Sequence, residues 1–365
     1  MENFTTYDSY GYNNAKLYED APGSKIRSSN LELLRIVSMI LIIMHHIAVH
    51  GGFTAEITAA NLVWRNTIRV GGKVGVNLFI MISGYFLIDS KFKPKKLLKL
   101  ILQVIFYTII IYFITIAINN ESFNKANFIK EIMSFATGYR YWFIPPYLIA
   151  YILSPYLKKL VQHCSQSEML FLIVFLMFVQ IILPELYGVE FMSNAVWFMT
   201  LYLIGSYIRV YKNHFFDDNV LMSCLFMVSL TIMVVFNVKL KIMQYDLKDV
   251  PCFTATVALF CWFKNLNIKN SKTINLIAST TLGIYLLHDN GCIRPLFWGK
   301  IMHCPAHESL PFMQFFIYTT VCIASVFIMG FILDIVRQLL FRYSEKLIEF
   351  IRKKTIHSKK KTAEA

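Results

Sequence analysis

The chain has 365 residues, of which 56% are hydrophobic and 16% are charged, and its mean hydropathy is +0.52. A soluble domain carries roughly a quarter charged residues to cover its surface, so this composition excludes an ordinary soluble globular protein. The formal net charge of +14 by itself suggests a nucleic-acid partner. The positive residues, however, gather in short segments between apolar runs, and we therefore expect membrane lipids and no nucleic acid as partners.

The N-terminal segment differs in character from the rest of the chain. Residues 1–30 are polar and rich in Asn, Tyr and Ser, which predicts a polar cytoplasmic segment and no cleaved secretory signal peptide. Residues 31–340 are dominated by apolar runs near the ~20 residues that a helix needs to cross a bilayer. We predict an all-α polytopic membrane helix bundle of about ten transmembrane helices, to within one. The predicted spans are 33–50, 74–88, 97–118, 143–160, 169–184, 194–211, 219–238, 250–264, 276–291 and 311–335.

The distribution of positive charge gives the predicted orientation. With the N- and C-termini in the cytoplasm, most of the 36 Lys and Arg residues fall in cytoplasmic segments, as the positive-inside rule requires. The last of these segments, residues 341–365, is a basic tail that we expect to lie against anionic headgroups, each Lys or Arg contributing about 1 kcal/mol. The other inner groups are Lys91, Lys93, Lys95, Lys96 and Lys99, then Lys158 and Lys159.

The outer segments carry three smaller predictions. Residues 58–70 place apolar and basic positions at helical spacing, which predicts a short interfacial helix before the second span. Seven cysteines are scattered without a CxxC pair, so we expect small apolar residues in helices, although Cys292 and Cys304 share one outer loop. The run His303, Cys304 and His307 lacks further well-placed ligands, and we predict no metal site.

The first predicted span holds ionisable residues inside the membrane. Residues 29–32 (SNLE) form a capping-box pattern at its start. Arg35 and His46 lie eleven residues apart, which places them about 20° from one another around a helix and about 16 Å apart along it. His50 continues this stripe about 40° further round, whereas His45 points about 100° away from His46 and is the weaker candidate.

Ionisable groups at such positions usually face a cavity, a partner or a substrate path. The alternative is that Arg35 extends to the inner headgroups while His46 hydrogen-bonds to a neighbouring helix. Their shared stripe favours a functional pair, with a cation near the cytosol and an imidazole near mid-bilayer.

Two ionisable residues at the outer end of the ninth span are candidate partners of this pair. We predict that His288 or Asp289 helps to orient His46 or the acceptor. The alternative is that both residues simply end a helix at the headgroups.

Several aromatic and polar residues have a structural explanation as well as a functional one. Trp142, Trp197 and Trp298 fall near predicted outer interfaces, where we expect an aromatic belt. Sugar stacking at an outer acceptor cleft is the alternative role. Asn77 and Ser83 in the second span are expected to hydrogen-bond across helices rather than to line a substrate channel.

The residues from Asn30 to His46 resemble the first-helix signature of the acyltransferase family 3 membrane proteins, which is an Arg or Lys, ten residues, and then His. In this chain the stretch is NLELLRIVSMILIIMHH. The similarity continues, in order, with VGVNLFIMISGYFLI in the second span, YWFIPPYLIAYILSPYL at 141–157, WFMTLYLIGSYI at 197–208 and GIYLLH at 283–288. It covers most of residues 28–340, and the order and spacing of the pieces make it specific.

The resemblance implies an enzyme of the bacterial plasma membrane that takes an acyl group, usually acetyl, from cytosolic acyl-CoA. The acceptor implied is a hydroxyl or amine of an extracytoplasmic glycan or its lipid-linked precursor, and no permanently bound cofactor is implied. The family's motif histidine and cation map onto His46 and Arg35, and a basic pair after the second helix maps onto Lys96 and Lys99. Because both members of this pair are Lys, we expect charge attraction to phosphate without bidentate recognition.

These residues suit acyl transfer from coenzyme A. The phosphates would bind at a basic cytoplasmic mouth formed by Arg35, Lys95, Lys96 and Lys99. His46 would act as general base on the acceptor hydroxyl, and an acyl-histidine intermediate is the alternative. The competing hypothesis for the whole chain is a flippase or exporter of lipid-linked polysaccharide precursors. Transporters of that kind often carry inverted repeats and matched Gly or Pro breaks, which we do not find in the sequence.

Overall fold

The computed structural model describes residues 28–54, 57–188, 192–211, 213–239 and 246–363, with side chains as far as residue 351. Every regular element in these ranges is helical, which confirms the predicted all-α class. Within the described ranges, six helices are long and apolar enough to cross a membrane. They are α1 (Ser29–His50), α2 (Ala59–Leu87), α3 (Pro94–Asn119), the continuous run of α7 (Gln166–Met177), η2 (Phe178–Ile182) and α8 (Leu183–Tyr187), α10 (Asn219–Lys239) and α14 (Phe312–Ala363).

Shorter helices fill the space between these six. Three of them match predicted spans closely. They are α6 (Ile144–His163) for the span 143–160, α9 (Asn194–Val210) for 194–211 and α11 (Val250–Asn265) for 250–264. The predicted span 276–291 is instead two short helices, α12 and α13. The shorter elements are α4 (Lys125–Ile132), α5 (Ser134–Thr137), α6 (Ile144–His163), α9 (Asn194–Val210), η3 (His214–Asp217), α11 (Val250–Asn265), α12 (Lys272–Ala278), α13 (Thr281–His288), η4 (Pro295–Ile301) and η5 (Cys304–His307).

The break between α12 and α13 has a local cause. The hydroxyls of Ser279 and Thr280 donate to the carbonyl oxygens of Leu276 and Ile277, each over 2.7 Å. Side-chain hydrogen bonds of this kind compete with the helical ladder. The chain therefore changes direction before α13, whose far end carries His288.

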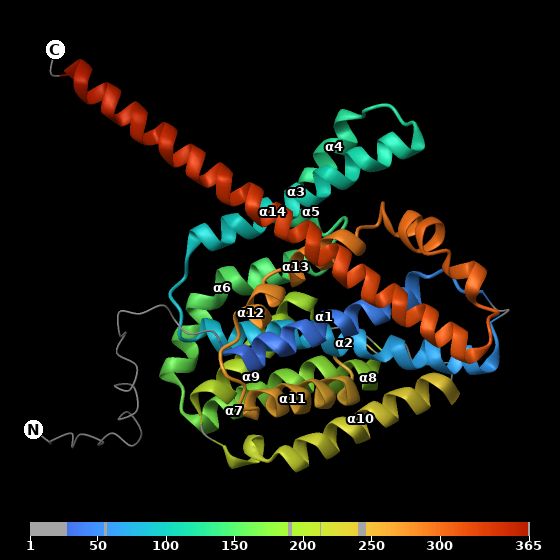
Figure 1. The fold of residues 1–365 in the computed structure, drawn as a ribbon. Helices are drawn as coiled ribbons and strands as arrows, with labels where there is room; N and C mark the ends of the chain where they lie inside the picture. Colours follow the sequence, from blue (N-terminus) through green and yellow to red (C-terminus); the bar gives the residue numbers. More distant parts are fainter. Residues whose placement is uncertain (1–27, 55–56, 189–191, 212, 240–245, 364–365) are drawn as a thin grey trace, which may run out of the picture.

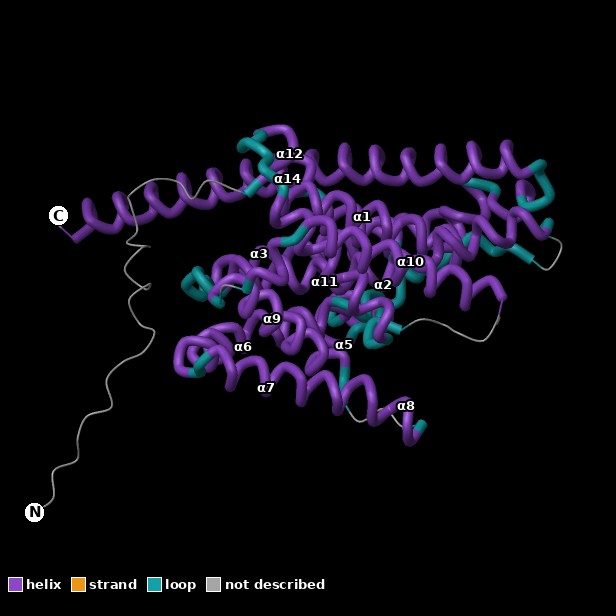
Figure 2. The backbone as a smooth tube through the Cα atoms, turned by 90° about the horizontal axis from the view of Figure 1, so that it is seen from below, coloured by secondary structure: helices purple, strands orange, loops and turns teal. Residues whose placement is uncertain are grey.

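Helices α1 and α2 form the centre of the bundle (Figure 1). Their buried side chains include Leu34, Ile43 and Leu78, each 0% exposed, and they pack with Phe198 and Leu201 of α9. Figure 2 shows α14 along one edge of the molecule and α7 and α8 along the opposite edge. In Figure 1, α1 begins and α14 ends on the same side of the bundle.

The prediction of a separate interfacial helix at 58–70 is wrong, because these residues form the first half of α2. Glycines in the middle of α2 let it approach α1 closely. A Cβ atom at Gly72 would overlap the His45 ring, and one at Gly75 would lie 2.6 Å from the Ser38 carbonyl oxygen. Small residues allow such contact between membrane helices. The packing against α1 keeps α2 helical through its glycines.

The predicted capping box at residues 29–32 is also wrong. Helix α1 begins after Ser28, without a side-chain cap. The Ser29 hydroxyl donates to Asn275 over 3.1 Å, and the Asn30 amide donates to the Lys264 carbonyl oxygen over 2.9 Å. These tertiary partners replace the local cap and tie the start of α1 to the end of α11 and to α12.

Helix α14 is much longer than the predicted span 311–335. It continues through most of the predicted basic tail at 341–365 and projects beyond the other helices in Figure 1. Lys99 of α3 lies 2.8 Å from Glu345 in this extension. Because both side chains are more than half exposed, the ion pair adds little stability.

Candidate active site

Two histidines from distant parts of the chain meet inside the bundle. His46 near the end of α1 and His288 at the end of α13 are 8% and 0% exposed. The His46 Nδ1 atom lies 2.9 Å from the His288 Nε2 atom. The His288 Nδ1 atom lies 2.6 Å from the Ile284 carbonyl oxygen.

These two contacts define the tautomers of the neutral rings. A carbonyl oxygen can only accept, so His288 carries its proton on Nδ1 and accepts at Nε2. His46 must then donate from Nδ1, which leaves the lone pair on its Nε2 atom. The arrangement thus points the basic nitrogen of His46 away from His288.

Asp289 lies next to this basic nitrogen. Its Oδ1 atom is 3.5 Å from His46 Nε2 and 3.9 Å from His50 Nε2. Arg294 donates to the same oxygen from Nε over 2.9 Å and from Nη2 over 2.5 Å. The guanidinium charge favours the ionised form of this carboxylate, whereas burial opposes it. A proton taken up at His46 Nε2 therefore meets a negative charge at short range.

Three polar atoms around the histidine pair are open to a ligand. The Tyr285 hydroxyl, Asp289 Oδ2 and Trp298 Nε1 are buried and make no well-formed hydrogen bond among the described residues. The rings of His46 and Tyr285 have centroids 6.5 Å apart, as do those of His288 and Trp298. Buried polar groups in native proteins normally have partners, so these atoms mark a place for a substrate or water.

Arg35 lies in a different part of the bundle. It lines a pocket of about 690 Å³ together with Lys96, Ser83, Tyr147 and Tyr151. Its Nε atom is buried, makes no hydrogen bond in the described structure and lies 3.3 Å from Glu32 Oε2. The pocket therefore holds two of the four predicted donor-binding cations.

The other two predicted cations lie outside this pocket. Lys95 is exposed at the start of α3, and Lys99 is paired with Glu345 of α14. His46 does not line the pocket either. The structure thus brings Arg35 together with Lys96, and His46 together with His288 and Asp289, as two separate groups.

A row of aromatic rings lies between the two groups. Tyr147 in the pocket stacks on Phe143 at 5.6 Å between ring centroids. Phe143 is 5.8 Å from Tyr285, which is 6.5 Å from His46. These ring contacts connect the two groups through the protein.

Three residues of these two groups are not among those predicted from the sequence: Arg294, Tyr147 and Tyr151. The two tyrosines lie four residues apart on one face of α6, and this helical spacing was a usable signal. Arg294 stands at the N-terminal end of η4, five residues after Asp289, where no periodicity points to it.

Two of the three tryptophans predicted for an aromatic belt are buried instead. Trp197 and Trp298 are 0% exposed, whereas Trp142 is 36% exposed. The Trp197 Nε1 atom donates to Asn77 Oδ1 over 3.0 Å, and the Asn77 amide donates to the Leu247 carbonyl oxygen over 2.8 Å. Because its N–H group is satisfied inside the protein, the indole of Trp197 needs no interfacial water. Asn77 thus forms a hydrogen bond between α2 and α9, as expected.

His46, His50 and Asp289 also offer three possible metal-ligand atoms within 4.8 Å of one another. The Asp289 oxygen in this set already accepts two hydrogen bonds from Arg294. A divalent cation there would face the guanidinium charge at short range, which opposes binding. The arrangement suits proton transfer better than metal coordination.

Long apolar helices around a buried pair of histidines define a multi-pass membrane protein with a polar site inside its helical bundle. A family model described as an acyltransferase domain matches residues 28–331. The chain therefore belongs to acyltransferase family 3, and it is a membrane acyltransferase. Nothing among the curated proteins or the solved structures matches the chain significantly.

Proposed function

We propose that this acyltransferase moves an acyl group, most simply acetyl, from cytosolic acyl-CoA to a hydroxyl of an extracytoplasmic glycan or lipid-linked saccharide in the bacterial plasma membrane. The observation that carries the proposal is the contact between His46 and His288. It leaves a basic nitrogen of His46 beside Asp289, among buried polar atoms that make no well-formed hydrogen bond in the described structure.

The proposal includes ten membrane crossings with both termini in the cytoplasm. The six long helices would be joined by α6, α9, α11 and the pair α12 and α13. Two contacts support this alternation on one side of the bundle. Arg209 in the last turn of α9 lies 2.9 Å from Asp89, which follows α2, and Asn30 meets the end of α11. On the opposite side, Thr54 after α1 donates to Glu308 before α14 over 2.5 Å.

The pocket that holds Arg35 and Lys96 is the proposed donor site. Its two cations attract the coenzyme A phosphates by charge-assisted hydrogen bonds. The pantetheine arm then follows the row of Tyr147, Phe143 and Tyr285, which places the thioester beside His46.

In the proposed reaction, the acceptor oxygen attacks the thioester carbonyl carbon while its proton passes to His46 Nε2. The new C–O bond forms, the C–S bond breaks, and the proton leaves with the coenzyme A thiol. Asp289 stabilises the imidazolium formed on the way, and the Tyr285 hydroxyl is placed to donate to the developing oxyanion. A positioned base of this kind contributes about 10²–10⁴-fold to the rate.

The test compares His46→Ala with His45→Ala in purified full-length protein in nanodiscs. His45 is the matched control because its Nδ1 atom is held by the Arg69 carbonyl oxygen at 2.6 Å, on another face of α1. Coenzyme A release from acetyl-CoA is measured with an extract of lipid-linked and surface glycans as acceptor.

We expect the His46 variant to lose about 10²-fold or more of this activity and the His45 variant to retain most of it. Equal loss in the two variants would exclude His46 as the base. Movement of a lipid-linked saccharide without any coenzyme A release would favour the exporter hypothesis instead.

A further inference from the structure

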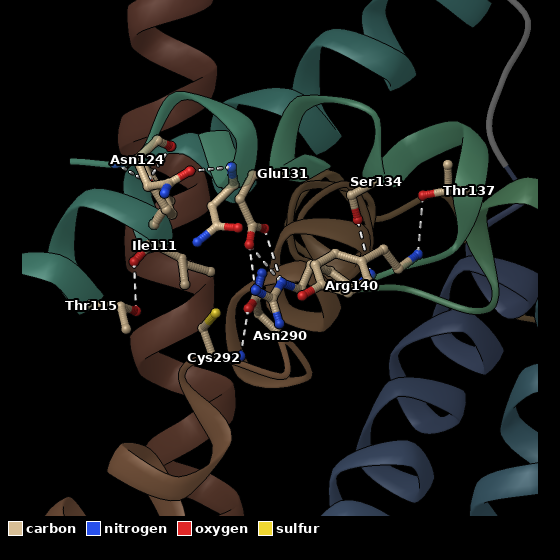
Figure 3. Close-up of polar contacts among 12 residues, drawn as sticks. Ile111, Thr115, Asn124, Glu131, Ser134, Thr137, Arg140, Asn290 and Cys292 are labelled. Carbon is tan, nitrogen blue, oxygen red and sulfur yellow. Dashed lines mark hydrogen bonds and ion pairs between the residues drawn. The ribbon is translucent and has the colours of Figure 1, made fainter. Parts of the chain in front are cut away.

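A second polar pocket lies at the end of the bundle opposite Arg35. It lies between the C-terminal end of α3, α4, the segment before α6 and the turn after α13 (Figure 3), and its volume of about 450 Å³ is in part open to solvent. Its lining includes Arg140, Glu131, Tyr139 and Cys292. The donor pocket and the reaction chemistry proposed above use none of these residues.

An ion pair builds one wall of this outer pocket. Glu131 on α4 is 3% exposed, and the Arg140 Nε atom donates to both of its carboxylate oxygens over 2.9 Å. The Arg140 Nη2 atom bonds to Glu131 as well, and the Arg140 backbone N–H donates to the Ser134 hydroxyl over 3.0 Å. Burial lowers the pKa of Arg140, but the Glu131 carboxylate outweighs this and raises it overall. The two side chains are therefore held in place as an ion pair with no net charge.

The two other charged side chains that line the pocket also carry opposite charges. Lys130 offers a positive charge and Glu121 a negative one. A pocket with equal numbers of opposite charges does not select an acidic or a basic ligand by net charge. It does offer strong donors and acceptors to a neutral polyhydroxylated ligand.

Tyrosine rings supply the apolar part of the pocket. The Tyr139 ring is 56% exposed and carries the Arg140 guanidinium 4.3 Å from its centre. Tyr112 contributes a second ring, held by its hydroxyl bond of 3.0 Å to the Asn124 carbonyl oxygen. A flat aromatic face packs against the C–H face of a sugar ring, while the charged pair accepts and donates to its hydroxyls.

Neighbouring residues connect this pocket to the active site. The Asn290 amide donates to the Tyr141 hydroxyl over 3.0 Å, and that hydroxyl donates to the Leu286 carbonyl oxygen over 2.7 Å. Tyr141 follows Arg140 in the chain, and Asn290 follows Asp289. The wall of the outer pocket is thus continuous with the segment that carries the catalytic centre.

We propose that the outer pocket binds a neutral sugar ring of the acceptor, adjacent to the ring whose hydroxyl is acylated. The inference rests on the proposed function for the direction of transfer, but sugar binding itself can be measured without any reaction.

The experiment uses full-length protein in nanodiscs and saturation-transfer NMR. The probes are methyl β-D-glucopyranoside and its acidic counterpart, methyl β-D-glucopyranosiduronic acid. Tyr139→Ala removes the exposed ring, and Tyr139→Phe keeps it. Lys125→Ala is the matched surface control, because Lys125 is an exposed cation on α4 that does not line the pocket.

We expect saturation transfer to the neutral glycoside, reduced at least about fivefold by Tyr139→Ala and unchanged by the other two variants. Arg140→Lys, which keeps the charge but loses the fork geometry, should weaken the signal as well. No transfer to the neutral glycoside, equal transfer in every variant, or stronger transfer to the acidic glycoside would overturn the inference.

A separate result tests the proposed function. Coenzyme A release from acetyl-CoA is measured in the same samples. Selective binding of the neutral glycoside without coenzyme A release would refute the proposed reaction and leave the sugar site standing. Coenzyme A release without glycoside binding would refute the sugar site and leave the proposed reaction standing.

Discussion

The tautomer of His46 is set by a carbonyl oxygen that His46 itself does not touch. Ile284 accepts from His288, and His288 accepts from His46, so the lone pair of His46 is directed toward Asp289. Arg294 donates to that carboxylate and favours its charged form. Each group in this series of contacts limits the protonation state of the next. In this way a buried imidazole acquires one defined basic atom.

Replacing Asp289 with Asn should lower the transfer rate about 10–100-fold. The amide keeps the size of the side chain but offers no charge to the His46 imidazolium. Coenzyme A release at saturating acetyl-CoA measures this effect. Lys264→Gln is the control, since it removes one partner of a remote ion pair with Asp217. Full activity of the Asn variant would remove Asp289 from the reaction.

Lys96→Ala should raise the Michaelis constant for acetyl-CoA about tenfold, whereas Lys99→Ala should leave it within about twofold. Lys96 lines the inner pocket with Arg35, but Lys99 lies outside it against Glu345. Losing one charge-assisted phosphate contact costs about 1.4 kcal/mol, a factor of ten. Steady-state kinetics with acetyl-CoA as the varied substrate distinguish the two lysines. An equal shift in both variants would place the phosphates elsewhere.

At the scale of elements, the contact of α1 with α2 supports the helix that carries His46. Gly72 lies directly against the ring of His45, the neighbour of His46 in the chain. On its other side, α2 meets α9 through Gly84, where a Cβ atom would lie 2.7 Å from the Tyr202 Cα atom. Membrane helices that pack through small residues tolerate little added volume there.

Gly72→Ala should therefore destabilise the protein by about 1–3 kcal/mol, the usual cost of overpacking. Gly299→Ala is the control, because nothing lies within 4 Å of its added Cβ atom. Thermal unfolding in detergent, followed by fluorescence, compares the two midpoints. A Gly72 variant as stable as the Gly299 variant would show that α1 and α2 can separate at little cost.

At the scale of the whole molecule, the number of crossings decides on which side of the membrane some of the connecting segments lie. Ten crossings put the loop before α12 in the cytoplasm, whereas crossing by the six long helices alone would put it outside. Both schemes put the start of α4 outside. Lys125 and Lys269 are exposed residues in these two segments.

Labelling of whole cells with a membrane-impermeant maleimide tests this topology. Under ten crossings, Lys125→Cys should be labelled above the level of the unchanged protein, and Lys269→Cys only after the cells are opened. Labelling of Lys269→Cys in intact cells would contradict ten crossings. It would also place the start of α1 and the loop before α12, which the structure brings together, on opposite sides of the membrane.

The sequence alone determined the helical class and the positions of most helices, and it put Arg35 and His46 on one helix. These features depend on hydrophobic runs and on helical periodicity, which neighbouring residues set. It also placed His288 and Asp289 at the end of a helix that could reach His46.

Only the tertiary structure decided which of these residues meet. The bond between His46 and His288 joins residues 242 positions apart, and Arg294 reaches Asp289 from the N-terminal end of η4. Tertiary contacts also merged the predicted interfacial helix into α2 and buried Trp197 against Asn77. Periodicity fixes the face on which a side chain lies, but the partner it meets there depends on how the helices pack.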